Sequence, residues 1–360
     1  MSDLYAGLMS GTSLDGVDAV LAAFRDTRTQ VLASSHVAFD AGLRAELLAL
    51  NAPGANELER AALAGNALAR HYARAIAALD MHKHGQVRAI GCHGQTVRHR
   101  PEKDFTLQIG NAALLAELTG IAVVADFRSR DLAAGGQGAP LAPAFHAAAF
   151  ASRDEDRVAL NLGGIANISW LPRAGPIVGF DTGPANCLMD LWSARHLGST
   201  HDTGGAWAAG GTLDAALLAR LLEDPFFAAP PPKSTGRDLF NGAWLEAKLR
   251  GGEDPRAVQA TLLELTARSI ADAMARHAPG ARRVIACGGG ARNDALMRRL
   301  SALLAPAVVE SSDRHGLAPE LVEATAFAWL ARQAVEGRPG NLPSVTGARG
   351  ARVLGAYYPA

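Results

Sequence analysis

The sequence predicts an α/β protein of two domains. Apolar segments of strand length alternate with longer segments of helical periodicity, and this alternation is typical of α/β folds. A pair of apolar segments joined by a glycine-rich turn occurs twice, first within residues 4–24 and again within residues 158–170. The 360 residues are enough for two domains with sizeable cores. The repeated opening indicates a structural duplication, with one copy at the start of each domain.

The first glycine-rich turn follows the apolar residues 4–6 and precedes the apolar residues 19–24. It contains the sequence Gly-Leu-Met-Ser-Gly-Thr-Ser-Leu-Asp-Gly-Val-Asp, residues 7–18. Glycines let backbone N–H groups approach an anion closely. Hydroxyl and carboxylate oxygens can hold a phosphate together with its metal ion. The turn therefore predicts nucleotide chemistry.

The next elements continue the alternation of strand and helix. Asn56 and Glu59 have the spacing of an N-cap pair ahead of a long helix with apolar positions up to residue 79. A buried strand is expected over 87–92, a helix over 111–118 and a strand over 121–125. Residues 128–143 are polar and glycine-rich, and we expect the domain junction near them. We predict an N-terminal lobe of residues 1–127 plus about 338–360, and a C-terminal lobe of residues 128–337.

The second half repeats the opening and then adds longer helices. After the hairpin of 158–170, a strand over 177–180 ends at Asp181, and a helix begins near Leu188. Asp254 and Pro255 are the N-cap and first residue of a long helix. In order, the remaining predicted elements are a strand over 283–287 running into Gly288-Gly289-Gly290, a helix over 320–335, and a tail over 345–360 that packs back as a short strand or helix.

Three glycine-rich sites follow predicted strands, and their number matters more than any one of them. A single such site commonly makes only a turn. Three at strand ends favour nucleotide binding, since a glycine-rich turn before a helix brings backbone N–H groups close to a phosphate. The sequence lacks both GxxxxGK[ST] and GxGxxG, which argues against a P-loop enzyme and against a Rossmann dinucleotide site.

Two carboxylates have a structural and a chemical interpretation, and the residues alone leave both open. Asp181 can accept a proton from an attacking nucleophile, or it can cap the following helix. Glu323 lies in the first turns of the last long helix, where composition favours a solvated or helix-dipole role. The repeated Asp-Thr-Gly at 181 and 202 does not indicate an aspartic protease, because the copies are too close together and the chain is not all-β.

Composition excludes several classes of function. The formal net charge is zero and no basic run occurs, so no nucleic-acid partner is expected. The most apolar long stretch, 112–124, is too short to cross a bilayer, and no signal peptide is visible. The histidines lack the spacing typical of a zinc site, so none is expected. Three cysteines without CxxC spacing, Cys92, Cys187 and Cys287, suit free thiols in a reducing cytoplasm.

The chain resembles the anhydro-N-acetylmuramic acid kinases, a family of the actin, Hsp70 and sugar-kinase ATPase superfamily, over essentially its full length. This resemblance implies an actin-like ATPase (ribonuclease H-like) fold with an interdomain cleft. Six segments carry it: 7–18 quoted above, GCHGQTV at 91–97, NLGGIAN at 161–167, FDTGPAN at 180–186, PKSTGR at 232–237 and CGGGARN at 287–293.

The resemblance implies a double reaction on 1,6-anhydro-N-acetylmuramic acid. Water attacks C1 while O6 accepts the γ-phosphoryl group of ATP, and the products are N-acetylmuramic acid 6-phosphate and ADP. Mg²⁺ is expected to bridge the phosphates, with its protein ligand unknown. The resemblance further implies peptidoglycan recycling in a bacterial cytoplasm, amino-sugar catabolism and a homodimer.

The resemblance also implies roles for particular residues. Asp181 is the expected general base and a substrate contact. The expected ATP contacts are Gly11, Thr12, Ser13, Leu14, Asp15, Gly16, Val17, Asp18, Asn161, Gly163, Gly164, Gly288, Gly289, Gly290 and Asn293, and the other expected substrate contacts are Glu323, His93, Thr96 and Arg130.

Two alternatives remain at this point. A conventional sugar kinase would phosphorylate a free hydroxyl and need no attacking water. A nucleotide-gated chaperone or binding module would need a peptide-binding or polymer-forming segment, and we expect no room for one after residue 337.

Overall fold

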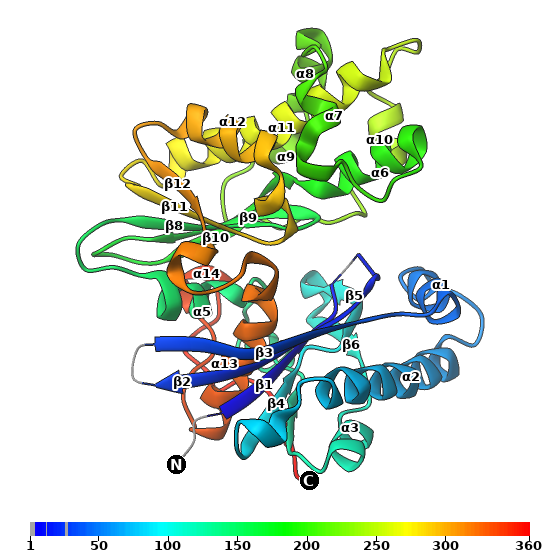
Figure 1. The fold of residues 1–360 in the computed structure, drawn as a ribbon, viewed down its shortest axis with the longest axis vertical. Helices are drawn as coiled ribbons and strands as arrows, with labels where there is room; N and C mark the ends of the chain where they lie inside the picture. The colour runs from blue at the N-terminus through cyan, green and yellow to red at the C-terminus, as the bar shows by residue number, and fades with distance from the viewer. Residues whose placement is uncertain (1–3, 12, 26–27) are drawn as a thin grey trace. The chain divides into compact units, whose positions relative to one another are not determined.

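The computed structural model describes residues 4–11, 13–25 and 28–360, which form two compact units (Figure 1). The first unit comprises 1–149 with 321–360, and the second comprises 150–320. The boundaries thus differ from the expected 127/128 and 337/338. The physical reason is the last long helix, α13 (Val322–Val335), which packs on strands of the first unit rather than joining the second.

The first unit is built on a six-stranded sheet with the order β13-β7-β4-β1-β2-β3. β2 pairs antiparallel with both β1 and β3, whereas β1, β4 and β7 run parallel. The chain returns at its end to add β13 antiparallel to β7. The strands are β1 (Leu4–Met9), β2 (Gly16–Arg25), β3 (Arg28–Ala38), β4 (Val87–Cys92), β7 (Val123–Ala125) and β13 (Ala356–Tyr358).

Helices cover both faces of this sheet. Ala6 and Leu8 belong to a core shared with α2 (Glu57–Ala77), whereas Gly7, which points to the opposite face, lies against α13. A small hairpin, β5 (Gln95–Arg100) and β6 (Phe105–Ile109), stands apart from the sheet. The remaining helices of this unit are α1 (Ala41–Ala49), α3 (Ala112–Thr119), α4 (Ser129–Ala133), α14 (Pro343–Thr346) and most of α5 (Ala142–Phe150).

The second unit has a five-stranded sheet with the order β10-β9-β8-β11-β12. β9 is antiparallel to β8 and β10, and β8, β11 and β12 are parallel. The strands are β8 (Arg157–Leu162), β9 (Ile165–Leu171), β10 (Val178–Pro184), β11 (Arg283–Cys287) and β12 (Val308–Ser311). The helices are α6 (Asn186–Leu197), α7 (Ala206–Ala209), α8 (Ala215–Leu222), α9 (Pro225–Ala228), α10 (Gly242–Glu246), α11 (Pro255–His277) and α12 (Asp294–Leu304).

The two sheets repeat one topology. Numbered within each unit, five strands follow the order three-two-one-four-five, with strand two antiparallel and strand four parallel to strand one. The predicted α/β class and the structural duplication are therefore confirmed. This arrangement agrees with the expected actin-like, ribonuclease H-like fold in each unit.

Several local predictions need correction. Asn56 has a left-handed backbone, and its amide donates to the Glu59 carboxylate (2.5 Å) instead of capping backbone N–H groups. The strand expected over 177–180 is β10, which begins at Val178 and extends to Pro184. Its pairing with β9 continues beyond Asp181 through a register shift between Asp181 and Gly183. The segment of 128–143 contains α4 and the start of α5, and the tail forms both α14 and β13.

Candidate functional site

In the first unit, the candidate site residues follow strands that end at one edge of the sheet. β1, β4 and β7 are parallel, so their carboxyl ends lie at the same edge. Gly11 follows β1, His93 follows β4, and Arg128 follows β7. Ligands of open α/β sheets bind at this edge.

The first hairpin tip is tied to the segment after β4 by hydrogen bonds. The Gln95 amide donates to the Gly11 carbonyl (3.2 Å), and the Ser10 hydroxyl donates to the Gly94 carbonyl (3.2 Å). The Ser10 hydroxyl also bonds to the buried Tyr72 hydroxyl (2.8 Å). A Cβ at Gly11 would meet nothing closer than the Ser13 hydroxyl at 3.7 Å, so the tip presents open backbone.

The other residues expected in the first phosphate loop divide into two groups. Leu14 and Val17 are buried in the core, so only their backbone is available to ATP. A Cβ at Gly16 would approach the Val37 carbonyl oxygen to 2.5 Å, which shows that this glycine is needed for strand packing.

The hydroxyl and carboxylate groups of the same loop are held locally. Ser13 donates to the Asp15 carboxylate (2.6 Å), and Asp18 on β2 bonds to His36 Nδ1 (2.8 Å). Both pairs are exposed. Thr12 lies outside the described residues.

A cluster of His93, Arg128 and Glu323 lies at this edge of the first unit. The Arg128 guanidinium donates to His93 Nε2 (2.9 Å from Nη2) and to the Gly138 carbonyl (2.8 Å). Burial and the nearby Arg128 charge lower the His93 pKa to about 3, so its imidazole is neutral. Burial lowers the Arg128 pKa to about 10, and the charge of Glu323 opposes that decrease. The cluster therefore combines a neutral imidazole, a guanidinium and a carboxylate in a poorly solvated place, which suits recognition of a polar ligand.

Two glycines set the position of Glu323. A Cβ at Gly7 would overlap the Ala324 carbonyl oxygen, and one at Gly91 would overlap the Phe327 carbonyl oxygen. α13 thus lies directly on β1 and β4, and its Phe327 ring contacts His93 (centroids 4.7 Å apart). The close approach brings the first turn of α13, which carries Glu323, to the edge of the sheet.

Arg128 is the residue that sequence reasoning missed, although Arg130 in the same segment was expected. Arg130 is exposed on α4, whereas Arg128 contacts His93. The signal was present, because Arg128 follows the predicted strand of 121–125 by three residues. Thr96 lies on β5, where its hydroxyl accepts from the Gln108 amide (3.2 Å).

The second unit repeats the edge arrangement with different chemistry. β8, β10 and β11 run in the same direction, so Asn161, Asp181 and Gly288 lie at one edge. The second hairpin tip is tied to the start of α6 by backbone bonds. The N–H groups of Ala185 and Cys187 donate to the Gly164 carbonyl (3.0 and 3.1 Å).

Asp181 is held by the loop that follows α9. Its carboxylate accepts from the Thr235 backbone N–H (2.9 Å), and its own N–H donates to the Lys233 carbonyl (3.2 Å). Burial raises the Asp181 pKa to about 7, while the Thr235 bond and the Lys233 charge act against the increase. Part of the residue remains accessible. It bonds to the backbone of another loop and does not cap α6, for which no side-chain capping bond exists.

A carboxylate with a pKa near 7 can accept a proton at neutral pH. The loop of 232–237, which contains Thr235, was noted from the sequence only as a possible anion grip. Its structural role is to hold Asp181 in place.

The third glycine site combines tight and open positions. A Cβ at Gly288, whose φ is +77°, would lie 2.5 Å from Asn161 Oδ1, and one at Gly290 would lie 2.7 Å from Leu162 Cβ. A Cβ at Gly289 would meet nothing within 4 Å. Asn293 is the N-cap of α12 and accepts from Leu296 N–H (3.0 Å). Gly288 and Gly290 therefore let the turn pack on β8, and Gly289 is the one open to a ligand, as are Gly163 and Gly164 at the second tip.

No group of three or more His, Cys, Asp or Glu side chains in the described part of the chain is placed to hold a metal ion. Within that part, no helix has the length and apolar character needed to cross a membrane.

Comparisons with known proteins agree on one family. The sequence profile of anhydro-N-acetylmuramic acid kinase matches residues 3–360. A protein of that name from Variovorax paradoxus (strain S110) is 58% identical over 372 residues, covering 99% of each chain. Another from Nitrosomonas europaea is 52% identical over 362 residues, again covering 99% of each chain.

Solved structures resemble the chain more distantly. The activator of the 2-hydroxyisocaproyl-CoA dehydratase from Clostridium difficile with bound ADPNP has 12% identity and a TM-score of 0.47, covering 93% of this chain and 96% of its own. A ROK family glucokinase from Streptomyces griseus in complex with glucose and AMPPNP has 16% identity and a TM-score of 0.42, covering 92% and 99%. The fold assignment above rests on strand order and direction, not on these likenesses.

Proposed function

The chain belongs to the anhydro-N-acetylmuramic acid kinase family, and from that premise we propose that it opens and phosphorylates 1,6-anhydro-N-acetylmuramic acid with ATP. Water attacks C1, the C1–O6 bond breaks, and O6 takes the γ-phosphoryl group as the bond to ADP breaks. The products are N-acetylmuramic acid 6-phosphate and ADP, and the water proton goes to Asp181.

The observation that supports this function best is the environment of Asp181. Its carboxylate lies at the carboxyl edge of the second sheet, it is fixed by Thr235, and its pKa is about 7. A base with a pKa near 7 is largely deprotonated at neutral pH and is still basic enough to accept a proton from water. We propose Asp181 as the general base that deprotonates the attacking water.

The open glycines are the best candidates for ATP contacts. Gly11, Gly163, Gly164 and Gly289 have room for a ligand beside their backbone. Backbone N–H groups can then bind phosphate without a side chain in the way. Ser13 and Asp15, adjacent to Gly11, add a hydroxyl and a carboxylate on the same tip. Leu14, Gly16 and Val17 of the first tip are proposed to contact ATP through their backbone. The further proposed ATP contacts, in the second unit, are Asn161, Gly288, Gly290 and Asn293.

Mg²⁺ is the expected companion of ATP. The exposed carboxylates of Asp15 and Asp18 near the first tip fit it, since Mg²⁺ in phosphate sites commonly takes one or two carboxylates together with phosphate oxygens. When bound, the ion neutralises charge that develops on the phosphates.

Residues of the first unit are proposed to bind the sugar. His93, Arg128 and Glu323 offer an acceptor or donor ring nitrogen, a cation and a carboxylate, and Thr96 adds a hydroxyl on β5. Arg130 is exposed two residues away from Arg128 and is proposed as a second cationic contact. We also propose a homodimer acting in the bacterial cytoplasm in peptidoglycan recycling.

Labelled water tests the proposed reaction directly. The protein is incubated with ATP and the anhydro sugar in ¹⁸O-water, and the product is analysed by mass spectrometry and NMR immediately after turnover. We expect one ¹⁸O atom at C1 and none in the phosphate ester. Phosphorylation without ¹⁸O at C1 would instead indicate a conventional sugar kinase that uses a free hydroxyl. Sugars with a free 6-hydroxyl, N-acetylmuramic acid and N-acetylglucosamine, serve as controls.

A further inference from the structure

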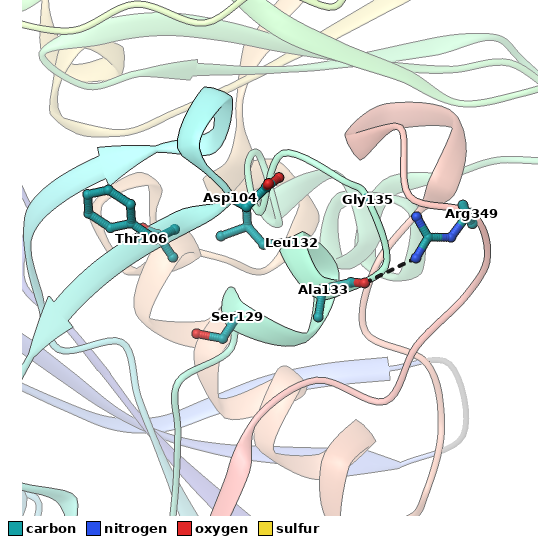
Figure 2. Close-up of a pocket in the computed structure, with 8 residues that line it drawn as sticks. Asp104, Thr106, Ser129, Leu132, Ala133, Gly135 and Arg349 are labelled. Atoms are coloured by element: carbon teal, nitrogen blue, oxygen red, sulfur yellow. Dashed lines mark hydrogen bonds between the residues drawn. The ribbon is translucent and has the colours of Figure 1, made fainter.

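Two cavities of the described chain differ greatly in size. The cavity of the first unit, between β6, α4 and Arg349, has a volume of about 430 Å³ (Figure 2). The cavity of the second unit, between β10, α9 and α11, has only about 10 Å³, which is room for about one water molecule. Lys233, Arg276 and His277 line the smaller cavity. Because no larger ligand fits there, their charges act on the protein around them.

Lys233 is held in this cavity by two aromatic residues. Its ammonium donates to the Phe226 carbonyl (2.9 Å) and lies 4.5 Å from the centroid of the Phe226 ring. The centroid of the Phe180 ring is 5.9 Å from the same nitrogen. Cation–π attraction and the hydrogen bond together fix a side chain that is only half-buried. The ammonium is therefore occupied by the protein itself, which argues against the anion grip considered for this loop.

Lys233 approaches Asp181 from the opposite face of β10. Phe180 and Asp181 are neighbours on this strand, so their side chains point to opposite faces. The Phe180 ring is buried against His277 of α11, with the ring centroids 5.0 Å apart. The Lys233 carbonyl accepts the Asp181 N–H (3.2 Å). One residue thus contacts both the backbone of Asp181 and the aromatic ring on the other face.

The same loop reaches the Asp181 carboxylate two residues further on. The Thr235 N–H donates to Asp181 Oδ2 (2.9 Å). Only one residue separates this donor from Lys233, so the contacts of Lys233 limit how far the N–H can move. A hydrogen bond weakens steeply when its distance or angle changes. The anchoring of Lys233 therefore helps to set the place of the carboxylate.

The Lys233 charge acts on the carboxylate as well. Burial raises the Asp181 pKa to about 7, and the Lys233 charge opposes this increase. Burial and the Arg276 charge lower the Lys233 pKa, whereas the Asp181 charge raises it. The charged and titratable groups that face Lys233 are thus Asp181 on β10 and Asp272, Arg276 and His277 on α11, and α9 carries none.

We propose that Lys233 is a positioning residue for Asp181, because it anchors the loop that holds the carboxylate and places a positive charge on the far side of the strand. The proposal rests on the proposed function, since it concerns the base of that reaction. It assigns Lys233 no contact with ATP or with the sugar.

The first test asks whether the two residues act together. Turnover is measured for the wild type, Lys233→Met, Asp181→Asn and the double variant. Methionine keeps an apolar side chain but lacks the charge and the hydrogen-bond donor. We expect Lys233→Met to lower kcat about tenfold, since a small misplacement of a catalytic group is costly, and to leave KM for both substrates within about twofold of the wild type.

The double variant should turn over no more slowly than Asp181→Asn, because the effects of residues that act as a unit are not additive. A loss in the double variant that multiplies the two single losses would overturn the proposal, since Lys233 would then act independently of Asp181.

The pH profile separates the role of the charge from a purely structural role. A nearby positive charge favours the ionised carboxylate, so Lys233→Met should move the acidic limb of kcat/KM to higher pH by about 0.5–1 unit. Lys233→Arg keeps a charge and a donor for the Phe226 carbonyl, and it should restore the wild-type limb and most of the turnover. An unshifted limb in Lys233→Met would count against the proposal.

Lys248→Met is the matched control, because it removes a lysine of the same unit whose charge is not among those acting on Asp181. Its kcat and its pH profile should match those of the wild type. A limb that shifts equally in Lys248→Met would overturn the assignment to Lys233.

A readout that needs no turnover keeps this proposal distinct from the proposed function. The Asp181 carboxyl is titrated by NMR in protein with ¹³C-labelled aspartate, and the spectrum of Asp181→Asn identifies its signal. We expect a higher Asp181 pKa in Lys233→Met than in the wild type or Lys233→Arg. An unchanged pKa overturns the role of Lys233 whatever the activity. Full activity of Asp181→Asn, or no phosphorylation of the anhydro sugar by the wild type, would instead overturn the proposed function.

Discussion

The two units share one strand order but stabilise their hairpin tips by different means. In the first unit, side chains hold the tip, since Gln95 and Ser10 reach across to the Gly11 and Gly94 carbonyls. In the second unit, backbone N–H groups at the start of α6 hold the tip through the Gly163 and Gly164 carbonyls. The fold therefore specifies where a tip lies, and the sequence decides how rigidly and by which groups it is held.

The same comparison extends to the chemistry at each edge. The first edge carries a neutral His93 with Arg128 and Glu323, a combination that can bind a polar ligand. The second edge carries Asp181, whose carboxylate can exchange a proton near pH 7. Under the proposed function, one copy of the duplicated scaffold serves substrate recognition and the other serves proton transfer. Five experiments can break or sharpen this division.

The largest effect is expected from Asp181→Asn. We expect turnover to fall by about 10²–10⁴-fold, the usual contribution of a positioned base, with little change in the affinity for either substrate. Steady-state kinetics and calorimetry on the same preparation measure both. Near-wild-type turnover would remove Asp181 from the mechanism and would end the proposed division of labour.

The pH dependence of kcat/KM should report the protonation of Asp181. Because the active form of a base is deprotonated, kcat/KM should rise about tenfold per pH unit below pH 7 and level off above it. Asp181→Asn should lose this limb.

The free energy of unfolding should fall as pH rises, whereas kcat/KM should rise. The pKa of Asp181 is raised in the folded state from 3.8 to about 7, so between about pH 4 and 7 the folded protein binds more protons than the unfolded chain. Its free energy of unfolding therefore falls as pH rises through that window. Asp181→Asn removes this loss, and at pH 8 it should be the more stable protein by roughly 1–3 kcal/mol. Denaturant unfolding at pH 5 and pH 8 checks the sign, and an equal difference at both values would contradict it.

The hairpin tip of the first unit is tested by Gly11→Val. The free protein has space for the Cβ, so thermal unfolding should change little, whereas the methyl groups occupy the place proposed for a phosphate. We expect ATP affinity to fall at least about tenfold, a cost of roughly 1.4 kcal/mol, and sugar affinity to stay near the wild-type value. Calorimetry with an unchanged ATP dissociation constant would refute the assigned loop.

The smallest effects distinguish packing glycines from open ones. Gly91→Ala places a methyl group against the Phe327 carbonyl oxygen and should destabilise the protein by about 1–3 kcal/mol or more. Gly289→Ala meets nothing within 4 Å, so its unfolding temperature should match that of the wild type. Equal destabilisation by both substitutions would show that the assignment of open and closed glycines is wrong.

Much of the fold was predictable because its signals are local. The strands over 87–92 and 283–287 and the helix that starts at Pro255 follow from apolar runs and capping residues, and the structure confirms them. The three glycine-rich turns also predicted three strand ends near which candidate site residues lie. The catalytic candidate Asp181 was named from its place after a strand.

The rest depended on contacts between distant segments. The helix that carries Glu323 was expected in the second lobe, because nothing in its own residues indicates that Gly7 and Gly91 leave a flat surface for it. The loop containing Thr235 looked solvated in sequence, yet it supplies the N–H that holds Asp181. The sequence predicts Arg130 rather than Arg128 as a substrate contact. The two residues are of one type, and only their position on α4 and their burial distinguish them.

The helix α13 has a consequence for the order in which the protein assembles on the ribosome. The second unit is one continuous stretch, 150–320, whereas the first needs residues from both ends of the chain. Domains generally fold as units during synthesis, so the second can complete its core first. The surface at Gly7 and Gly91 meanwhile waits for the last forty residues. A nascent chain paused before α13 would expose that surface, and it is there that we would look for chaperone binding.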